Sequence, residues 1–261
     1  MNLTQIVEQL YFIGSYLSKI GVDISFVRCF PGEFLMGSSQ GKKYAKATEI
    51  PQHSVRITKD FFISKNLITE AQWLRIMKKK PRLFRARENE NQSFPVEGVT
   101  WIEAVAFCES LSEMLRKSNQ IRDGQNVILP SEAQWEYACR AGTTTSWFFG
   151  EEENEIINYG WTSINSSRDL KPIGLKKPNP WGLLDTIGNV SEWVLDDFSL
   201  YKNEYELVND PVFLDPKSTL KVARGGSFSR LPKECRSASR EVIQTNNPYK
   251  ESVGFRPIII I

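Results

Sequence analysis

The sequence predicts an α+β fold with much irregular structure, preceded by one N-terminal helix. Three segments begin with a capping box, in which a Ser or Thr caps a helix and a Glu or Gln three residues later returns a hydrogen bond. They begin at Thr69, Thr100 and Ser131. Short apolar runs bounded by turn residues predict strands around these helices. After Gly142 the periodicity fades and turn residues become frequent, so we expect short strands and long loops there.

Residues 1–24 are expected to form a separate amphipathic helix that serves oligomerisation or partner docking. Apolar residues recur with alternating spacings of three and four, which is a heptad stripe that ends at Gly21. The stripe consists of Leu3, Ile6, Leu10, Ile13, Leu17 and Ile20. Other apolar residues widen the stripe to a second side, so packing of this helix on its own domain remains an equal alternative.

The domain that follows, residues 25–261, is expected to begin with two strand pairs. The segments 26–30 and 33–37 flank a Pro-Gly turn and predict a hairpin. The segments 54–58 and 61–65 predict a second strand pair around Lys59 and Asp60. The three capped helices follow, and the apolar run at 253–260 predicts the last strand.

Composition excludes several functional classes. The net charge of the 261 residues is +2, which gives no strong field for nucleic acid, and no apolar run is long enough to span a membrane. The single histidine, His53, excludes sites built from several histidines and is expected to be structural. The four cysteines have no CxxC spacing, and the first residues lack a signal-peptide pattern, so a reducing cytoplasm is the expected location.

Several motifs occur in an order that identifies a family. FPGEFLMGS, FPVEGVTWIEAVAFC, LPSEAQWEYACRAGT, NPWGLLDTIGNVSEW, RGGSF and GFRP follow one another from about residue 26 to the C-terminus. Together they resemble the formylglycine-generating enzyme family, also called sulfatase-modifying factors. The resemblance implies that family's fold, a variant of the C-type lectin fold. Arg224 and Arg256, in the last two motifs, are expected to anchor the scaffold through buried hydrogen bonds.

The same resemblance implies a structural calcium site in the segment 185–192. The implied ligands are the side chains of Asp185 and Glu192 and the carbonyl groups of Gly188 and Val190. Calcium takes six to eight oxygens, and a tight turn between two carboxylates can present several of them. The alternative is that both carboxylates are buried and held by arginine or by backbone amides.

The family's copper oxidases use a pair of cysteines, and this chain has Cys235 alone in the corresponding segment. Arg230 stands at the position of the partner, and a guanidinium does not ligate copper. We therefore expect no copper site and no catalytic residue. The alternative is a copper-dependent oxidase that acts on a protein cysteine, in which Cys235 pairs in space with Cys29, Cys108 or Cys139.

The polar segment between RGGSF and GFRP is expected to form a binding surface. A scaffold that holds such a loop between two fixed strands can present it to a partner. The expected surface residues are Arg230, Lys233, Glu234 and Tyr249, with the aromatic residues Phe148, Trp161 and Trp181. The predicted function is a non-catalytic, lectin-like module that binds a protein or peptide; a sugar ligand is a further alternative that fold analogy suggests.

Overall fold

The computed structural model of the chain describes residues 22–81, 93–202, 206–245 and 252–260. The predicted heptad helix and Tyr249 lie outside these ranges. Within them, no helix combines the length and the apolar character that crossing a bilayer requires. Val22 and Ile24, which sequence analysis placed in the N-terminal piece, are buried in the main hydrophobic core of the domain.

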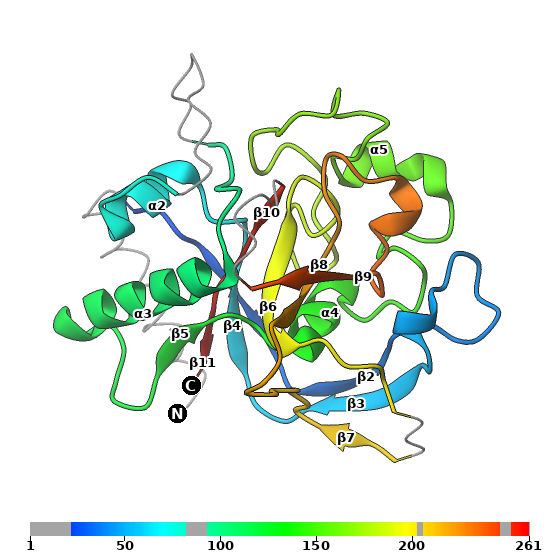
Figure 1. Cartoon of the computed structure of the whole chain (residues 1–261), viewed down its shortest axis with the longest axis horizontal. Helices are drawn as coiled ribbons and strands as arrows, with labels where there is room; N and C mark the ends of the chain where they lie inside the picture. The colour runs from blue at the N-terminus through cyan, green and yellow to red at the C-terminus, as the bar shows by residue number, and fades with distance from the viewer. Residues whose placement is uncertain (1–21, 82–92, 203–205, 246–251, 261) are drawn as a thin grey trace.

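The described elements form a mixed α+β fold, which confirms the predicted class, and its strands lie in three sheets (Figure 1). The helices are α2 (Glu70–Met77), α3 (Trp101–Lys117), α4 (Glu132–Arg140) and α5 (Ile156–Tyr159), with the short 3-10 turns η1 (Ala47–Glu49), η2 (Glu153–Glu155) and η3 (Pro232–Glu234). The strands are β1 (Phe26–Cys29), β2 (Gly32–Met36), β3 (His53–Ile57), β4 (Phe61–Ser64), β5 (Asn126–Ile128), β6 (Ser191–Asp197), β7 (Val208–Asn209), β8 (Leu220–Arg224), β9 (Arg240–Gln244), β10 (Val253–Gly254) and β11 (Ile258–Ile260). Their orders in the three sheets are β1-β4-β11-β5, β10-β6-β8-β9 and β2-β3-β7.

The three predicted capping boxes are confirmed. At the start of α2, α3 and α4 the hydroxyl of Thr69, Thr100 or Ser131 accepts a hydrogen bond from the third backbone N–H. The Gln or Glu at that third position accepts in return from the cap's backbone N–H. These reciprocal bonds satisfy amides that a helix start otherwise leaves without partners.

The predicted hairpins at the start of the domain are wrong in their pairing, although the strands exist. β1 pairs with β4 and β2 pairs with β3, all antiparallel, so the first and second strands belong to different sheets. Residues 30–31 and 58–60 separate the two ladders at the same level, because Cys29 lies opposite Phe61 on one side of the interruption and Gly32 lies opposite Ile57 on the other. A side-chain hydrogen bond from Arg28 to Asp60 closes the first ladder at this interruption. The predicted last strand is likewise divided, into β10 and β11.

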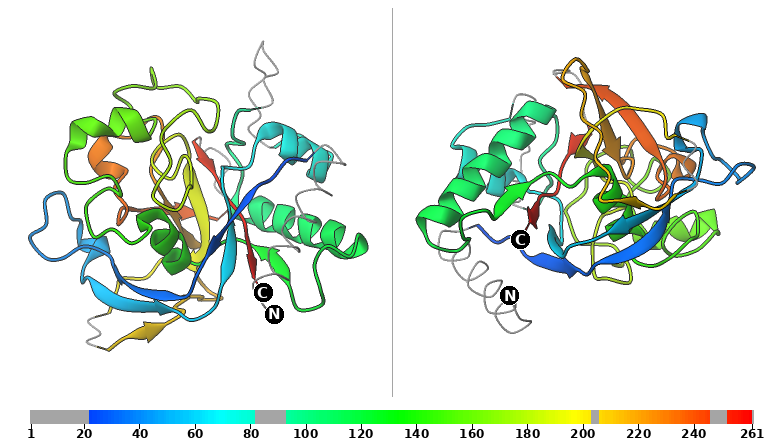
Figure 2. Two further views of the ribbon diagram at one scale, coloured as in Figure 1. Left: turned by 180° about the vertical axis from the view of Figure 1, so that it is seen from behind. Right: turned by 90° about the horizontal axis from the view of Figure 1, so that it is seen from below.

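Helices α2 and α3 cover one end of the molecule, and α4 lies between the second and third sheets (Figures 1 and 2). The largest core cluster joins α2 and α3 to the C-terminal segment through Trp73, Phe107 and Phe255. The rings of Trp73 and Phe107 stack with centroids 5.7 Å apart, and Phe255 contacts Phe107 edge-on at 5.1 Å. The end of the chain is therefore part of the core.

Buried ion pairs hold the sheets to the helices. The Arg256 guanidinium donates to both oxygens of Glu192, and Arg224 donates to Glu136; all four side chains are almost completely buried. Arg256 also donates to the backbone carbonyl of Leu184 at 2.8 Å. The prediction that Arg224 and Arg256 anchor the scaffold is confirmed.

Candidate functional site

The position of Cys235, the cysteine that the oxidase alternative needs, is set by the Gly-Gly-Ser turn after β8. Gly226 has φ of 69°, and a Cβ atom built there would lie 2.4 Å from the Cys235 sulfur. Glycine is needed because no side chain fits between the turn and the cysteine. Cys235 is fully buried and packs in a cluster with Trp147 and Phe148, and its thiol contacts the Leu231 carbonyl at 3.6 Å.

No other described cysteine lies in the hydrophobic cluster that contains Cys235. Burial raises the pKa of the Cys235 thiol to about 12. The four cysteines are buried, unpaired and distributed over four different hydrophobic clusters. Arg230, in the partner position, forms an ion pair with Glu241. None of the four described cysteines forms a disulfide.

The predicted calcium segment forms a tight turn in front of β6. Asp185 and Asn189 have φ of 56° and 60°, and the Gly188 amide donates to the carbonyl of Gly225, in the Gly-Gly-Ser turn after β8, at 2.9 Å. Both oxygens of Glu192 accept hydrogen bonds from Arg256, and one also accepts from the Trp135 indole at 2.8 Å.

Asp185 differs from Glu192. One of its oxygens accepts from the Gly174 amide at 2.7 Å, and the other is buried without a hydrogen-bond partner in the described structure. Burial raises the pKa of this carboxyl to about 6. Among the described residues, no three His, Cys, Asp or Glu side chains form a metal-binding group. Asp185 therefore has a carboxylate oxygen to offer a cation, whereas Glu192 is engaged by arginine; calcium at Asp185, Gly188, Val190 and Glu192 stays a prediction.

Some residues of the predicted binding surface lie together. The Ser163 amide donates to the Arg230 carbonyl at 2.9 Å, which joins the Trp161 loop to the segment before η3. The Lys176 ammonium lies 3.7 Å from the centre of the Trp161 ring. Lys233 is exposed, and Glu234 forms an ion pair with Lys46 at 3.7 Å.

The other two aromatic residues of that prediction lie elsewhere. Phe148 is buried beside Cys235 in the cluster under this surface. Trp181 packs edge-on against Tyr137 of α4, with centroids 4.9 Å apart, next to the core that β2 and β3 share.

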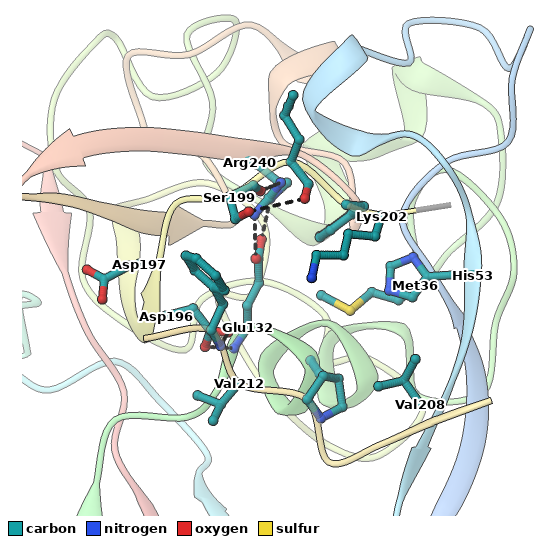
Figure 3. A pocket seen from close by; sticks show the side chains of 15 residues that line it. Met36, His53, Glu132, Asp196, Asp197, Ser199, Lys202, Val208, Val212 and Arg240 are labelled. Carbon is teal, nitrogen blue, oxygen red and sulfur yellow. Dashed lines mark hydrogen bonds and ion pairs between the residues drawn. The ribbon is translucent and has the colours of Figure 1, made fainter. Parts of the chain in front are cut away.

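Sequence analysis missed a cavity of about 190 Å³ between β3, the start of α4 and the end of β6 (Figure 3). Its lining comes from distant parts of the chain, including Met36, His53, Glu132, Asp196, Lys202 and Arg240. The only signal in the sequence was His53, which was expected to be structural. Its ring does have structural contacts: Nδ1 donates to the Pro51 carbonyl at 3.0 Å, and the ring lies edge-on to Tyr201.

A three-sheet α+β fold, a Gly-Gly-Ser turn over a buried cysteine and Arg–Glu anchors define the class of protein. Residues 23–261 match the model of the sulfatase-modifying factor enzyme 1-like domain. The chain belongs to this family, the one that contains the formylglycine-generating enzymes.

Curated relatives with different names share this similarity. The chaperone protein LppX of Paenibacillus barcinonensis is 27% identical, over 65% of this chain and 69% of its own length. The formylglycine-generating enzyme of Streptomyces coelicolor is 25% identical, over 88% of this chain and 87% of its length. The serine/threonine-protein kinase pkn1 of Chlamydia pneumoniae is 29% identical over 86% of this chain, which spans just 36% of that kinase.

Solved structures share the fold. Treponema denticola variable protein 1 superposes with a TM-score of 0.78 at 23% identity, covering 92% of this chain and 96% of that protein. PvdO from Pseudomonas aeruginosa superposes with a TM-score of 0.75 at 24% identity, covering 90% of this chain and 94% of PvdO. These similarities establish the architecture, and the activity has to be argued from the side chains.

Proposed function

We propose that this protein is a non-catalytic binding module that presents the surface around η3 to a protein or peptide partner. The observation that carries the proposal is the position of Cys235, which is fully buried in an apolar cluster that contains no second described cysteine. The scaffold around it is intact, because the glycine turn and the anchoring arginines keep their contacts. A folded scaffold without reactive thiols is suited to recognition.

Exposed apolar side chains surround the segment 229–234. Ile157, Ile164, Leu175 and Leu231 are 48%, 56%, 62% and 47% exposed. Hydrogen bonds and ring contacts connect their segments: Lys177 N–H donates to the Asn158 carbonyl at 3.0 Å, and Ser163 N–H donates to Arg230. Figure 1 shows α5 and the orange segment that contains η3 on the same side of the molecule. We call this surface the Trp161 face; it consists of Ile157, Trp161, Ile164, Leu175, Arg230, Leu231 and Lys233.

The Trp161 face has the composition of a protein-binding surface. Contiguous exposed apolar side chains bordered by charges are typical of interaction sites, and aromatic residues and arginine are enriched there. Lys176 above Trp161, together with Arg230 and Lys233, gives the face a basic border. The relative named a chaperone protein supports a protein ligand, whereas the relatives named formylglycine-generating enzymes support the oxidase alternative.

A random peptide library displayed on phage tests the proposal directly. We expect the wild-type protein to enrich a family of peptides that the Leu231→Asp variant does not retain. Leu220→Asp is the matched control, since Leu220 is 39% exposed at the start of β8, outside the Trp161 face. Failure to enrich any family, or equal retention by Leu231→Asp, would overturn the proposal.

The oxidase alternative has its own measurement. A Cu(I) titration against a competing chelator should show no tight stoichiometric site, because the sulfur atoms are dispersed. Tight binding that Cys235→Ser abolishes would establish the alternative and refute a non-catalytic role.

A further inference from the structure

We propose that the cavity in Figure 3 is a binding site for a carboxylate carried on a small apolar body, with the Lys202 ammonium as its ionic partner. Lys202 extends across the cavity and turns its ammonium into it, between Glu132 on one side and Met36 and His53 on the other. Among the described residues, no acidic side chain forms an ion pair with Lys202. This site shares no residue with the Trp161 face and does not depend on the function proposed for it.

The acidic side chains in the lining already have partners. Both oxygens of Glu132 accept from Arg240, at 2.7 and 2.8 Å. Asp197 forms an ion pair with Lys221 at 2.9 Å. The two oxygens of Asp196 accept from the backbone amides of Glu132 and Phe213, at 2.7 and 2.9 Å.

Arg240 uses four of its five N–H groups within the protein. Besides Glu132, it donates to the carbonyls of Thr48 and Ser199, at 2.7 and 2.9 Å, and Tyr201 covers its guanidinium 4.2 Å from the ring centre. Of the charged groups in the lining, Lys202 alone among the described residues lacks an ionic or hydrogen-bond partner. Lys202 is exposed, so water solvates its ammonium in the free protein, and a ligand anion in the cavity would replace that water with a charge-assisted hydrogen bond.

The remaining wall is apolar and determines the ligand's body. Leu200, Val208, Pro211, Val212 and Phe213 contribute to the lining, and Leu200 is 60% exposed at the rim. A volume of about 190 Å³ is smaller than the roughly 300–1,000 Å³ of pockets for drug-sized molecules. The cavity therefore suits a body the size of an aliphatic side chain, with its carboxylate at Lys202.

Two sources can supply this chemistry: a free apolar amino acid or other small organic acid, and the C-terminal residue of a peptide. N-acetyl-leucine carries the chemistry that both sources share, a carboxylate on an apolar body. N-acetyl-leucinamide is its matched control, because an amide replaces the carboxylate. The Met36 methyl group lines the cavity and provides a local NMR reporter. Free leucine and the tripeptide Gly-Gly-Leu then identify the source, and preferential binding of either supports the proposal.

We expect N-acetyl-leucine to shift the Met36 methyl signal saturably and N-acetyl-leucinamide to bind at least about tenfold more weakly, as the loss of a charge-assisted hydrogen bond predicts. The Lys202→Gln substitution should weaken the binding of N-acetyl-leucine by a similar factor. Lys233→Gln, on the Trp161 face, should leave its affinity unchanged. An unmoved Met36 signal, equal binding of the amide, or undiminished binding to Lys202→Gln would overturn the proposal.

Discussion

Replacing Arg256 by methionine should be among the most destabilising single substitutions in this protein. Methionine keeps much of the side-chain length but removes both hydrogen bonds to Glu192 and the donors to the Leu184 and Ser64 carbonyls. Among the described residues, Glu192 then keeps only the Trp135 indole as a hydrogen-bond partner for its fully buried carboxylate. Breaking a buried ion pair by removing one member costs about 3–5 kcal/mol, a large share of the roughly 5–15 kcal/mol by which domains are stable.

Urea unfolding of Arg256→Met, Glu192→Gln and the double variant measures this cost as a thermodynamic cycle. The double variant should be less destabilised than the sum of the singles by about 2 kcal/mol, because no buried charge is then left without its partner. The thermal midpoint of Arg256→Met should fall by roughly 10 °C, at about 2–4 °C per kcal/mol for domains of this size. A cost below about 1 kcal/mol, or additive single effects, would refute the argument that this pair anchors the scaffold.

Three further predictions address the turn, the carboxyls and calcium. Gly226→Ala should destabilise the fold by at least about 1–3 kcal/mol, since alanine is strained at φ of 69° and its Cβ meets the Cys235 sulfur; urea midpoints check this, and Cys235→Ala should partly relieve it. Burial and the nearby charge of Glu132 raise the pKa of Asp196 from its ordinary value of 3.8 to about 7. Between these two pH values the folded protein keeps a proton on Asp196 that the unfolded chain has already released. Stability should therefore fall as pH rises from about 4 to 7, and Asp196→Asn should reduce that slope in urea titrations; a steeper slope would contradict the assignment. If the segment 185–192 holds calcium, added Ca²⁺ raises the thermal midpoint of the wild type but not of Asp185→Asn; a wild-type midpoint insensitive to Ca²⁺ contradicts the calcium prediction.

The sequence predicts the helices well because their start signals are local. A capping box needs two side chains three residues apart, so Thr69, Thr100 and Ser131 mark their helices without any knowledge of the tertiary structure. The ordered motifs likewise predict the architecture, because together they identify the family, and the members of a family share one fold.

Local sequence signals of this kind predict neither the pairing of the strands nor the cavity. The sequences at residues 30–32 and 58–60 are each compatible with a hairpin, yet β1 pairs with β4 and β2 pairs with β3, a choice that depends on contacts between segments about 30 residues apart. The cavity joins side chains as far apart as Met36 and Arg240, and each of them taken alone suggests a core or surface position. Proximity in space creates this site, and no spacing in the sequence encodes it.

The residues that identify the family are those that hold the fold together. Arg256 of GFRP binds Glu192 of the GNVSEW motif, and the Gly-Gly turn of RGGSF fits against Cys235. Substituting any of them should act on folding stability before it acts on binding. The residues that can distinguish this protein's function from those of its relatives are therefore the exposed side chains of the Trp161 face and the unpaired Lys202, where a substitution can change recognition and leave the scaffold intact.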